Sequence, residues 1–151
     1  MRRGSCGVLL GFVGMFVASA AIADGPLRFF SLTPCRAVDT RAGNAPALSA
    51  STTRDFQLQG VCGVPVGAKS VVVNITVATP SGQGHLRLFP SGVALPNIST
   101  INFTGSDVAL ANGAIVTVST NANDVSVYTF MLGGVGTVHL ILDVTGYFAT
   151  P

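Results

Sequence analysis

The sequence has little charge and no glutamate, which excludes one class of partner. Its 151 residues include 8 lysines and arginines and 6 acidic residues, all of them aspartate, for a formal net charge of +2. Arg2 and Arg3 account for this excess, so the chain from Asp24 onward carries equal numbers of positive and negative charges. Proteins that bind the phosphate backbone of nucleic acids cluster Lys and Arg on one surface. We therefore expect no nucleic-acid partner.

Residues that favour helices are also sparse, and Gly, Thr, Val, Asn and Ser dominate, as they do in β-rich chains. Apolar residues recur at every second position, which is the period of a half-buried strand. The clearest case is 71–77, where residues 71, 73, 75 and 77 would share an apolar face. Comparable strands are expected at 36–41, 54–59, 85–89, 99–103, 114–119, 124–128 and 138–144.

Short turns rich in Gly, Pro and Ser separate these segments, and no linker or internal repeat divides them. The expected turns lie at 79–82, 90–92, 104–107 and 132–134. Several strands have one polar face for solvent, which favours two packed sheets over a closed barrel. We therefore predict a single domain at 24–151, an all-β, two-sheet antiparallel β-sandwich of about 8–9 strands with a jelly-roll or Ig-like order.

Long apolar runs are absent except near the N-terminus. Arg2 and Arg3 precede an apolar segment at 8–23, which ends in Ala21-Ile22-Ala23. A positive start, an apolar segment and a small-x-small end are the three parts of a secretory signal peptide. The segment has about 16 residues, fewer than the roughly 20 that cross a bilayer, so we favour cleavage after Ala23 over retention as an anchor. Removal of residues 1–23 would leave no membrane span. The protein would be secreted, or periplasmic if the cell has an outer membrane.

Cysteine is scarce, with three residues in the chain, of which Cys6 lies in the predicted signal peptide. Cys35 and Cys62 remain, and two cysteines in an exported chain most simply form a disulfide. Metal ligation and a reactive thiol are the alternatives. Because the chain has no C-x-x-C pair, and His85 and His139 are distant in sequence, we expect the disulfide, no metal site and no cofactor.

A set of short motifs extends over nearly the whole chain after the predicted signal peptide. These are T-P-C-R-A-V-D-T-R at 33–41, G-V-C-G-V-P at 60–65, the strand at 69–77, L-F-P-S-G at 88–92, S-T-I-N-F at 99–103, A-N at 111–112 and D-V-T-G-Y-F at 143–148. Together they resemble a module of secreted bacterial proteins that occurs alone, in tandem or appended to extracellular hydrolases. The resemblance implies that the protein is extracellular and has an accessory role, and it assigns no catalytic residue.

Three charged residues next to Cys35 are the first candidates for a polar site: Arg36, Asp39 and Arg41. Asp39 and Arg41 are two residues apart on an expected strand, so their side chains would share a face. They either bind a ligand or calcium, or form a structural salt bridge or turn cap, and we favour the structural role. Asp143 is a second structural candidate, because it interrupts an apolar strand. We expect it to bond the backbone of a turn at 145–146.

No pattern in the sequence predicts a catalytic residue. His139 and Asp143 are four residues apart, but along a strand this spacing is about 13 Å, too long for a hydrogen bond. The G-x-S-x-G motif of many hydrolases is absent. The segment 121–124 is rich in Asn and Asp but lacks the D-x-[DN]-x-[DN]-G pattern of calcium loops, so we expect a hairpin turn there.

Tryptophan is absent, which limits an aromatic platform for carbohydrate to Tyr128, Phe130 and Tyr147. The competing expectation, which we favour, is that these rings fill the core or cover a sheet edge. The sequence thus favours a secreted non-catalytic accessory or structural module that contacts a glycan or protein at the cell surface. A carbohydrate- or cell-wall-binding module is the alternative, and a secreted hydrolase is favoured least.

Overall fold

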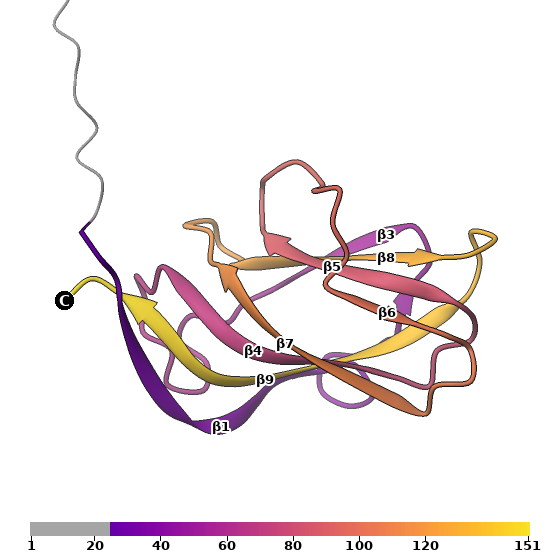
Figure 1. Ribbon diagram of the computed structural model, residues 1–151, viewed down its shortest axis with the longest axis horizontal. Coiled ribbons are helices and arrows are strands. Elements are labelled where there is room, and N and C mark those ends of the chain that lie inside the picture. The colour runs from indigo at the N-terminus through magenta and orange to yellow at the C-terminus, as the bar shows by residue number, and fades with distance from the viewer. Residues whose placement is uncertain (1–24) are drawn as a thin grey trace, which may run out of the picture.

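Two antiparallel sheets face each other in the computed structural model, which describes residues 25–151 (Figure 1). The predicted signal peptide and Cys6 lie outside the described residues. The described part contains no helix, and its nine strands are β1 (Arg28–Asp39), β2 (Leu48–Ser49), β3 (Thr52–Phe56), β4 (Ser70–Ala78), β5 (Gly84–Pro90), β6 (Ile101–Phe103), β7 (Ala109–Thr117), β8 (Val125–Met131) and β9 (Thr137–Ala149). The all-β, two-sheet expectation is confirmed.

The strand order is that of a jelly roll. One sheet has the order β1-β9-β4-β7, with the short β2 beside β9, and the other has the order β3-β8-β5-β6. The pairs β1 with β9, β3 with β8, β4 with β7 and β5 with β6 are nested within one another along the chain. This nesting arises when one long antiparallel hairpin of strand pairs folds over on itself. The β1–β9 and β4–β7 pairs then lie in one sheet, and the β3–β8 and β5–β6 pairs lie in the other. Of the two expected orders, the structure has the jelly roll.

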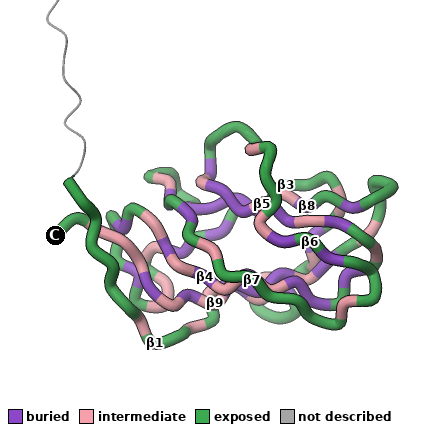
Figure 2. Tube along the Cα trace, viewed as in Figure 1, coloured by how far each residue is buried: buried purple, intermediate pink, exposed green. Residues whose placement is uncertain are grey.

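The core lies between the two sheets, and buried residues largely alternate with less buried ones along the inner strands (Figure 2). In β4 the expected residues Val71, Val73, Ile75 and Val77 are all fully buried. The long segment between β3 and β4 also contributes to the core, through Leu58 and Val64. Burial of each such side chain stabilises the folded protein by about 1.5–3 kcal/mol relative to leaving it exposed. The alternating pattern therefore decides which face of each strand is internal.

The first and last strands are longer than the sequence indicates. β1 begins at Arg28 and β9 continues to Ala149, because the two strands pair with each other along their ends. The expected turn at 145–146 is therefore wrong: both residues lie inside β9, where the register with β4 shifts. A side chain at Gly146 would collide with Phe29, since a Cβ there would lie 2.4 Å from the Phe29 ring.

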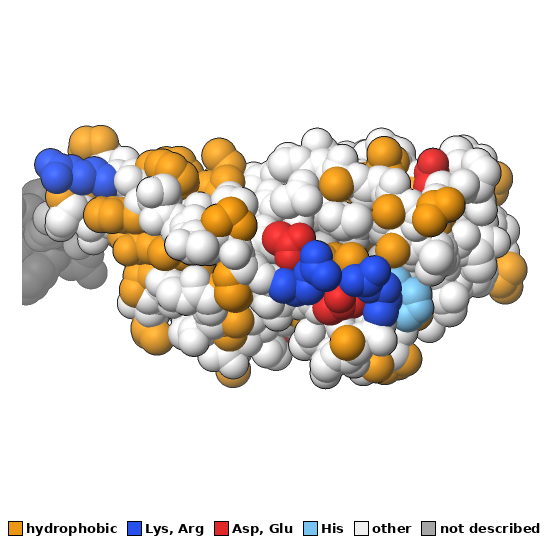
Figure 3. Space-filling view, turned by 90° about the horizontal axis from the view of Figure 1, so that it is seen from below, with side chains coloured by type: hydrophobic (Ala, Val, Ile, Leu, Met, Phe, Trp, Pro, Cys, Tyr) orange, Lys and Arg blue, Asp and Glu red, His pale blue; other side chains and the backbone are white. Residues whose placement is uncertain are grey.

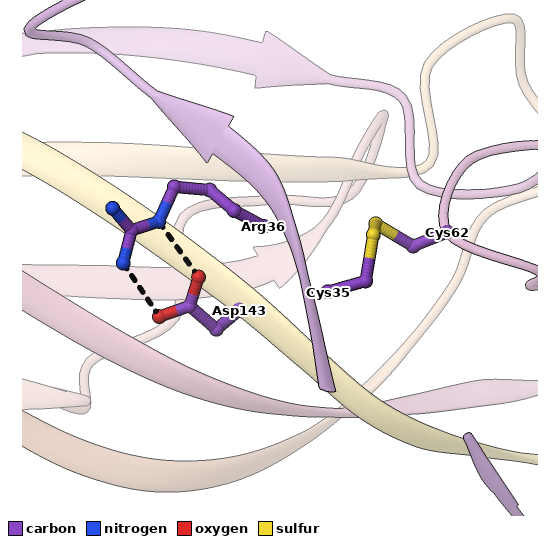
Figure 4. Close-up of a disulfide and its surroundings, with 4 residues drawn as sticks. All are labelled: Cys35, Arg36, Cys62 and Asp143. Atoms are coloured by element: carbon purple, nitrogen blue, oxygen red, sulfur yellow. Dashed lines mark hydrogen bonds and ion pairs between the residues drawn. A yellow bond between two sulfur atoms is a disulfide. The ribbon is translucent and has the colours of Figure 1, made fainter. Parts of the chain in front are cut away.

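A disulfide joins Cys35 of β1 to Cys62 in the segment between β3 and β4, as expected (Figure 4). The Cα atoms of the two cysteines are 5.6 Å apart. The bridge connects an edge strand of the first sheet to a segment without strand pairing of its own. Within residues 25–151 no helix is long and apolar enough to cross a membrane.

Candidate functional site

A shallow groove of about 470 Å³ lies on the outer face of the β1-β9-β4-β7 sheet, beside the disulfide. It is lined by Pro34, Cys35, Arg36, Asn74, Asp143 and Thr145, which come from β1, β4 and β9. Charged side chains gather on this face of the molecule (Figure 3). Because charge is rare in the chain, this concentration makes the face the first candidate site.

Arg36 and Asp143 meet because they are directly opposite each other in the β1–β9 pair. The neighbours of Asp143 in β9, Leu142 and Val144, are buried in the core, so Asp143 points outward. Arg36 donates from Nε to Asp143 Oδ1 at 2.9 Å and from Nη2 to Oδ2 at 3.2 Å. Figure 4 shows this pair, with Cys35 turned away toward Cys62. Such a two-point contact fixes the orientation of both side chains.

Asp39 and Arg41 extend the pair into a row of four charges. Arg41 donates from Nε to Asp39 Oδ1 at 2.9 Å and from Nη2 to Oδ2 at 2.7 Å, and Arg36 Nη1 lies 3.4 Å from the same Oδ2. We refer to Asp143, Arg36, Asp39 and Arg41 as the ion-pair network. It runs along the outer face from β9, across β1, to the start of the loop that follows β1.

The loop that follows Asp39 is also held by this carboxylate. The backbone N–H of Arg41 donates to Asp39 Oδ1 at 3.0 Å, and the N–H of Asp39 donates to the side-chain oxygen of Asn44 at 2.9 Å. From the other sheet, Arg54 donates to the carbonyl oxygens of Asn44 and Pro46. Asp39 therefore caps the turn in addition to its ion pairs.

The ion pairs shift the pKa values of Asp39, Arg36 and Arg41. Hydrogen bonds from Arg41, and the charges of Arg41 and Arg36, hold the pKa of Asp39 well below its usual range. The hydrogen bonds that Arg36 donates to Asp143 raise the pKa of Arg36 above its usual value, and those that Arg41 donates to Asp39 do the same for Arg41. With its pKa lowered in this way, Asp39 does not exchange a proton near neutral pH, which a general acid or base must do.

His139 lies on the same face, but it does not pair with Asp143. Its Nδ1 is 3.2 Å from the hydroxyl of Thr40, while Asp143 is bound by Arg36. The Thr40 side chain is buried, and its hydroxyl also accepts from the N–H of Leu140 at 2.8 Å. This hydroxyl is committed to the backbone of β9 and is not presented to a substrate.

Tyr128 and Phe130 form a second surface, on the outer face of the β3-β8-β5-β6 sheet. Their rings do not fill the core, contrary to the competing expectation, because alternate residues of β8 occupy it instead. Phe130 stacks on His85 with ring centroids 4.8 Å apart, and the Arg87 guanidinium lies 5.5 Å from the Tyr128 ring centroid. His85 and Arg87 carried no sequence signal for this role, since it depends on the β5–β8 register.

Tyr147 belongs to a different part of the molecule. It stacks on Phe30 at a centroid distance of 5.1 Å and packs against the core from the β1–β9 end of the other sheet. The three aromatic residues considered from the sequence therefore do not form one platform.

Asp124 is a buried carboxylate whose role the sequence did not indicate. It accepts hydrogen bonds from the N–H groups of Leu58 and Gln59 and from the Gln59 side chain. The Asn- and Asp-rich segment 121–124 connects β7 to β8, which lie in different sheets, so the expected hairpin turn is wrong. Its last residue, Asp124, anchors the β3–β4 segment. Among residues 25–151, no group of three or more His, Cys, Asp or Glu side chains is placed to hold a metal ion.

Comparison with known proteins gives no further assignment: no family model, no curated protein and no solved structure matches the chain. The function is therefore inferred from the chemistry of the two outer surfaces.

Proposed function

We propose that the chain is an exported, non-catalytic accessory module that acts through contacts made by the ion-pair network on its outer face. The proposal is based on two ion pairs, Arg36 with Asp143 and Arg41 with Asp39, each of which is joined by two hydrogen bonds. They present a fixed arrangement of donors and acceptors around the groove on the first sheet. Its partner is a glycan or protein at the cell surface.

The exposure of the two arginines supports a binding role. The side chain of Arg36 is 50% exposed and that of Arg41 is 45% exposed, although each makes two hydrogen bonds to a carboxylate. Exposed ion pairs contribute little to folding free energy. Arginine held in a fixed orientation is favoured at protein interfaces, because its planar group can bind further acceptors without new ordering.

Export is proposed from three features: the signal-peptide pattern at 1–23, the disulfide and the resemblance to secreted modules. The intact mass of protein collected outside the producing cells tests it. We expect a chain that begins at Asp24 and gains two hydrogens on reduction. A mass that includes residues 1–23, or a free-thiol signal in the native protein, would contradict this part.

Binding to washed envelope material of the producing cells tests the contact surface. We expect the wild-type protein to co-sediment with this material and Arg36→Gln and Asp143→Asn to co-sediment several-fold less. Arg28→Gln is the matched control, because it removes an exposed arginine from the same strand outside the groove. Equal sedimentation of all variants, or none by the wild type, would refute the proposal. Release of soluble fragments from the material would refute the non-catalytic part.

Carbohydrate binding is the second candidate function, favoured by one observation: Tyr128 and Phe130 share the outer face of the second sheet. Phe130 lines a cavity of about 360 Å³. Sedimentation that depends on Phe130 and not on Arg36 would favour this surface over the ion-pair network.

A further inference from the structure

Three neighbouring strands of the second sheet contribute to the cavity beside Phe130, together with the adjoining turns and Leu110 of β7. His85 of β5 is directly opposite Asn102 of β6 on one side and Phe130 of β8 on the other. These three residues form a row across the sheet, and all of them line the cavity. We refer to this cavity as the aromatic cleft. Its volume of about 360 Å³ lies within the range of small-molecule sites.

The walls of the aromatic cleft are apolar and open to solvent. The His85 and Phe130 rings are stacked with an angle of 16° between their planes, so they present one continuous aromatic surface. Leu110 and Leu132 complete the wall, and Leu132 is 66% exposed. Apolar side chains gathered around a hollow, unlike single exposed ones, indicate a surface that a ligand covers.

Polar groups of the cleft remain available for a ligand. The side-chain amides of Gln83 and Asn102 line it and make no hydrogen bond within residues 25–151. Two other side-chain amides are already bound: Asn112 donates to the carbonyl of Thr100, and Asn121 to that of Ser91. An amide both donates and accepts, which matches the hydroxyl groups of a sugar.

His85 adds a further donor and is uncharged. Burial and the nearby Arg87 charge lower its pKa below the usual value. Arg87 Nε donates to His85 Nε2 at 3.0 Å, so the proton of the neutral ring is on Nδ1, which is free to donate. The stacked ring can therefore contact an apolar ligand face and hydrogen-bond at its edge.

The charge of the cleft selects against an acidic ligand. Asp107 is the one carboxylate that lines it. Asp107 accepts from the N–H and the hydroxyl of Thr104, so its Oδ2 is already bound within the turn. Without a cation in the lining, a negatively charged group inside the cleft would meet repulsion from Asp107.

From these contacts we propose that the aromatic cleft binds a sugar ring of a neutral polysaccharide, with its apolar face on the rings of Phe130 and His85 and its hydroxyl groups on Asn102 and Gln83. The adjacent pair, Arg87 and Tyr128, lies two residues along the same strands and supplies the contact for the next part of the polymer. This site rests on the proposal of a non-catalytic binding module but is independent of the ion-pair network.

Affinity electrophoresis through gels that contain soluble neutral polysaccharides (a β-glucan, an α-glucan, a mannan and a xylan, each alone) tests the proposal. We expect at least one to retard the wild-type protein, and polygalacturonate, an acidic polymer, not to retard it. Phe130→Ala and Asn102→Ala should each weaken the retardation about tenfold. Ile115→Ala is the matched control, because it removes an exposed apolar side chain from the other sheet.

Each result has a defined meaning. Both substitutions lie on the outer face, and unchanged melting temperatures would show that the variants remain folded. Retardation that survives both substitutions, or absence of retardation by all four neutral polymers, would overturn the aromatic cleft as a sugar site. If envelope binding then still depends on Arg36, the proposed function stands without it; if neither assay shows binding, both fail.

Discussion

The guanidinium of Arg36 binds both carboxylate oxygens of Asp143, although 107 residues separate the two in the chain. The contact exists because β1 and β9, the first and last strands described, are neighbours in one sheet. Asp143 therefore has a charged partner in place of the backbone turn expected from the sequence. The size of the contribution of Asp143 to folding stability, and the dependence of that contribution on salt, follow from its pairing with Arg36.

Asp143→Asn should lower the melting temperature by a small amount that depends on salt. The substitution keeps the shape of the side chain but removes the charge that Arg36 binds, and the half-exposed Arg36 can be solvated instead. We expect the loss to be smaller at about 0.5 M salt than at about 0.02 M, because salt screens the pair. Thermal melts at both concentrations measure this. An equal loss at both would show that Asp143 acts through a neutral hydrogen bond.

Asp39 and Arg41 should behave as partners in one network. Asp39→Ala removes the acceptor for both the side chain and the N–H of Arg41, so it should destabilise more than Arg41→Gln does. The free energy of unfolding of the double variant should fall by less than the sum of the two single decreases, as is found for residues in direct contact. Urea denaturation of the wild type, the two single variants and the double variant gives the coupling free energy between Asp39 and Arg41. Strictly additive losses would mean that the ion pair does not brace the loop.

The contribution of Asp39 should disappear in acid. Its pKa is lower in the folded protein than in the unfolded chain, where it is about 3.9. Its stabilisation is therefore complete above about pH 5 and is lost as the pH falls through the folded pKa. We expect the free-energy difference between the wild type and Asp39→Asn to be constant from about pH 5 to 8 and to shrink below about pH 4. A difference that grows with acidity would contradict the assigned direction.

Asp124→Ala should destabilise the domain by about 3 kcal/mol, because it leaves two backbone N–H groups of the β3–β4 segment without an acceptor. Asp107→Ala serves as the comparison, since Asp107 also accepts from a backbone N–H but at an exposed turn. Its loss should stay below about 1 kcal/mol, as water can replace the carboxylate. Chemical denaturation measures both. Similar losses for the two variants would show that burial of Asp124 is not decisive.

Thr129→Val should stabilise the domain by about 1 kcal/mol. The Thr129 hydroxyl is buried in the core face of β8 and has no hydrogen-bond partner among the described residues. Valine has the same shape without the unpaired polar atom. Thr40→Val is the matched control and should destabilise, because the buried Thr40 hydroxyl accepts from the N–H of Leu140. A higher urea midpoint at unchanged slope is expected for Thr129→Val alone.

Local patterns were sufficient for the fold class. Alternation over 71–77 predicted a half-buried strand, and β4 (Ser70–Ala78) has those alternate residues in the core. The two cysteines after the predicted signal peptide were enough to predict the disulfide. The ends of β1 and β9 were not predictable in the same way, because their residues become strand by pairing with each other and not through their own periodicity.

The candidate sites depend on contacts between residues that are distant in sequence. Asp39 and Arg41 are two residues apart, so their proximity could be expected from the sequence. The row of Asn102, His85 and Phe130 could not, since three strands must first adopt a particular register. The buried position of Asp124 likewise follows from the docking of the β3–β4 segment against the β7–β8 connection.

The sequence by itself determined the local features of this protein. Alternating apolar residues require one buried face on each strand, residues rich in Gly and Pro form the turns, and the two cysteines can form a disulfide. The tertiary structure decided which polar side chains meet, because strand order and register are properties of the whole chain. Arg36 faces Asp143, and His85 lies between Asn102 and Phe130, only after the nested strand pairs have rolled into two sheets.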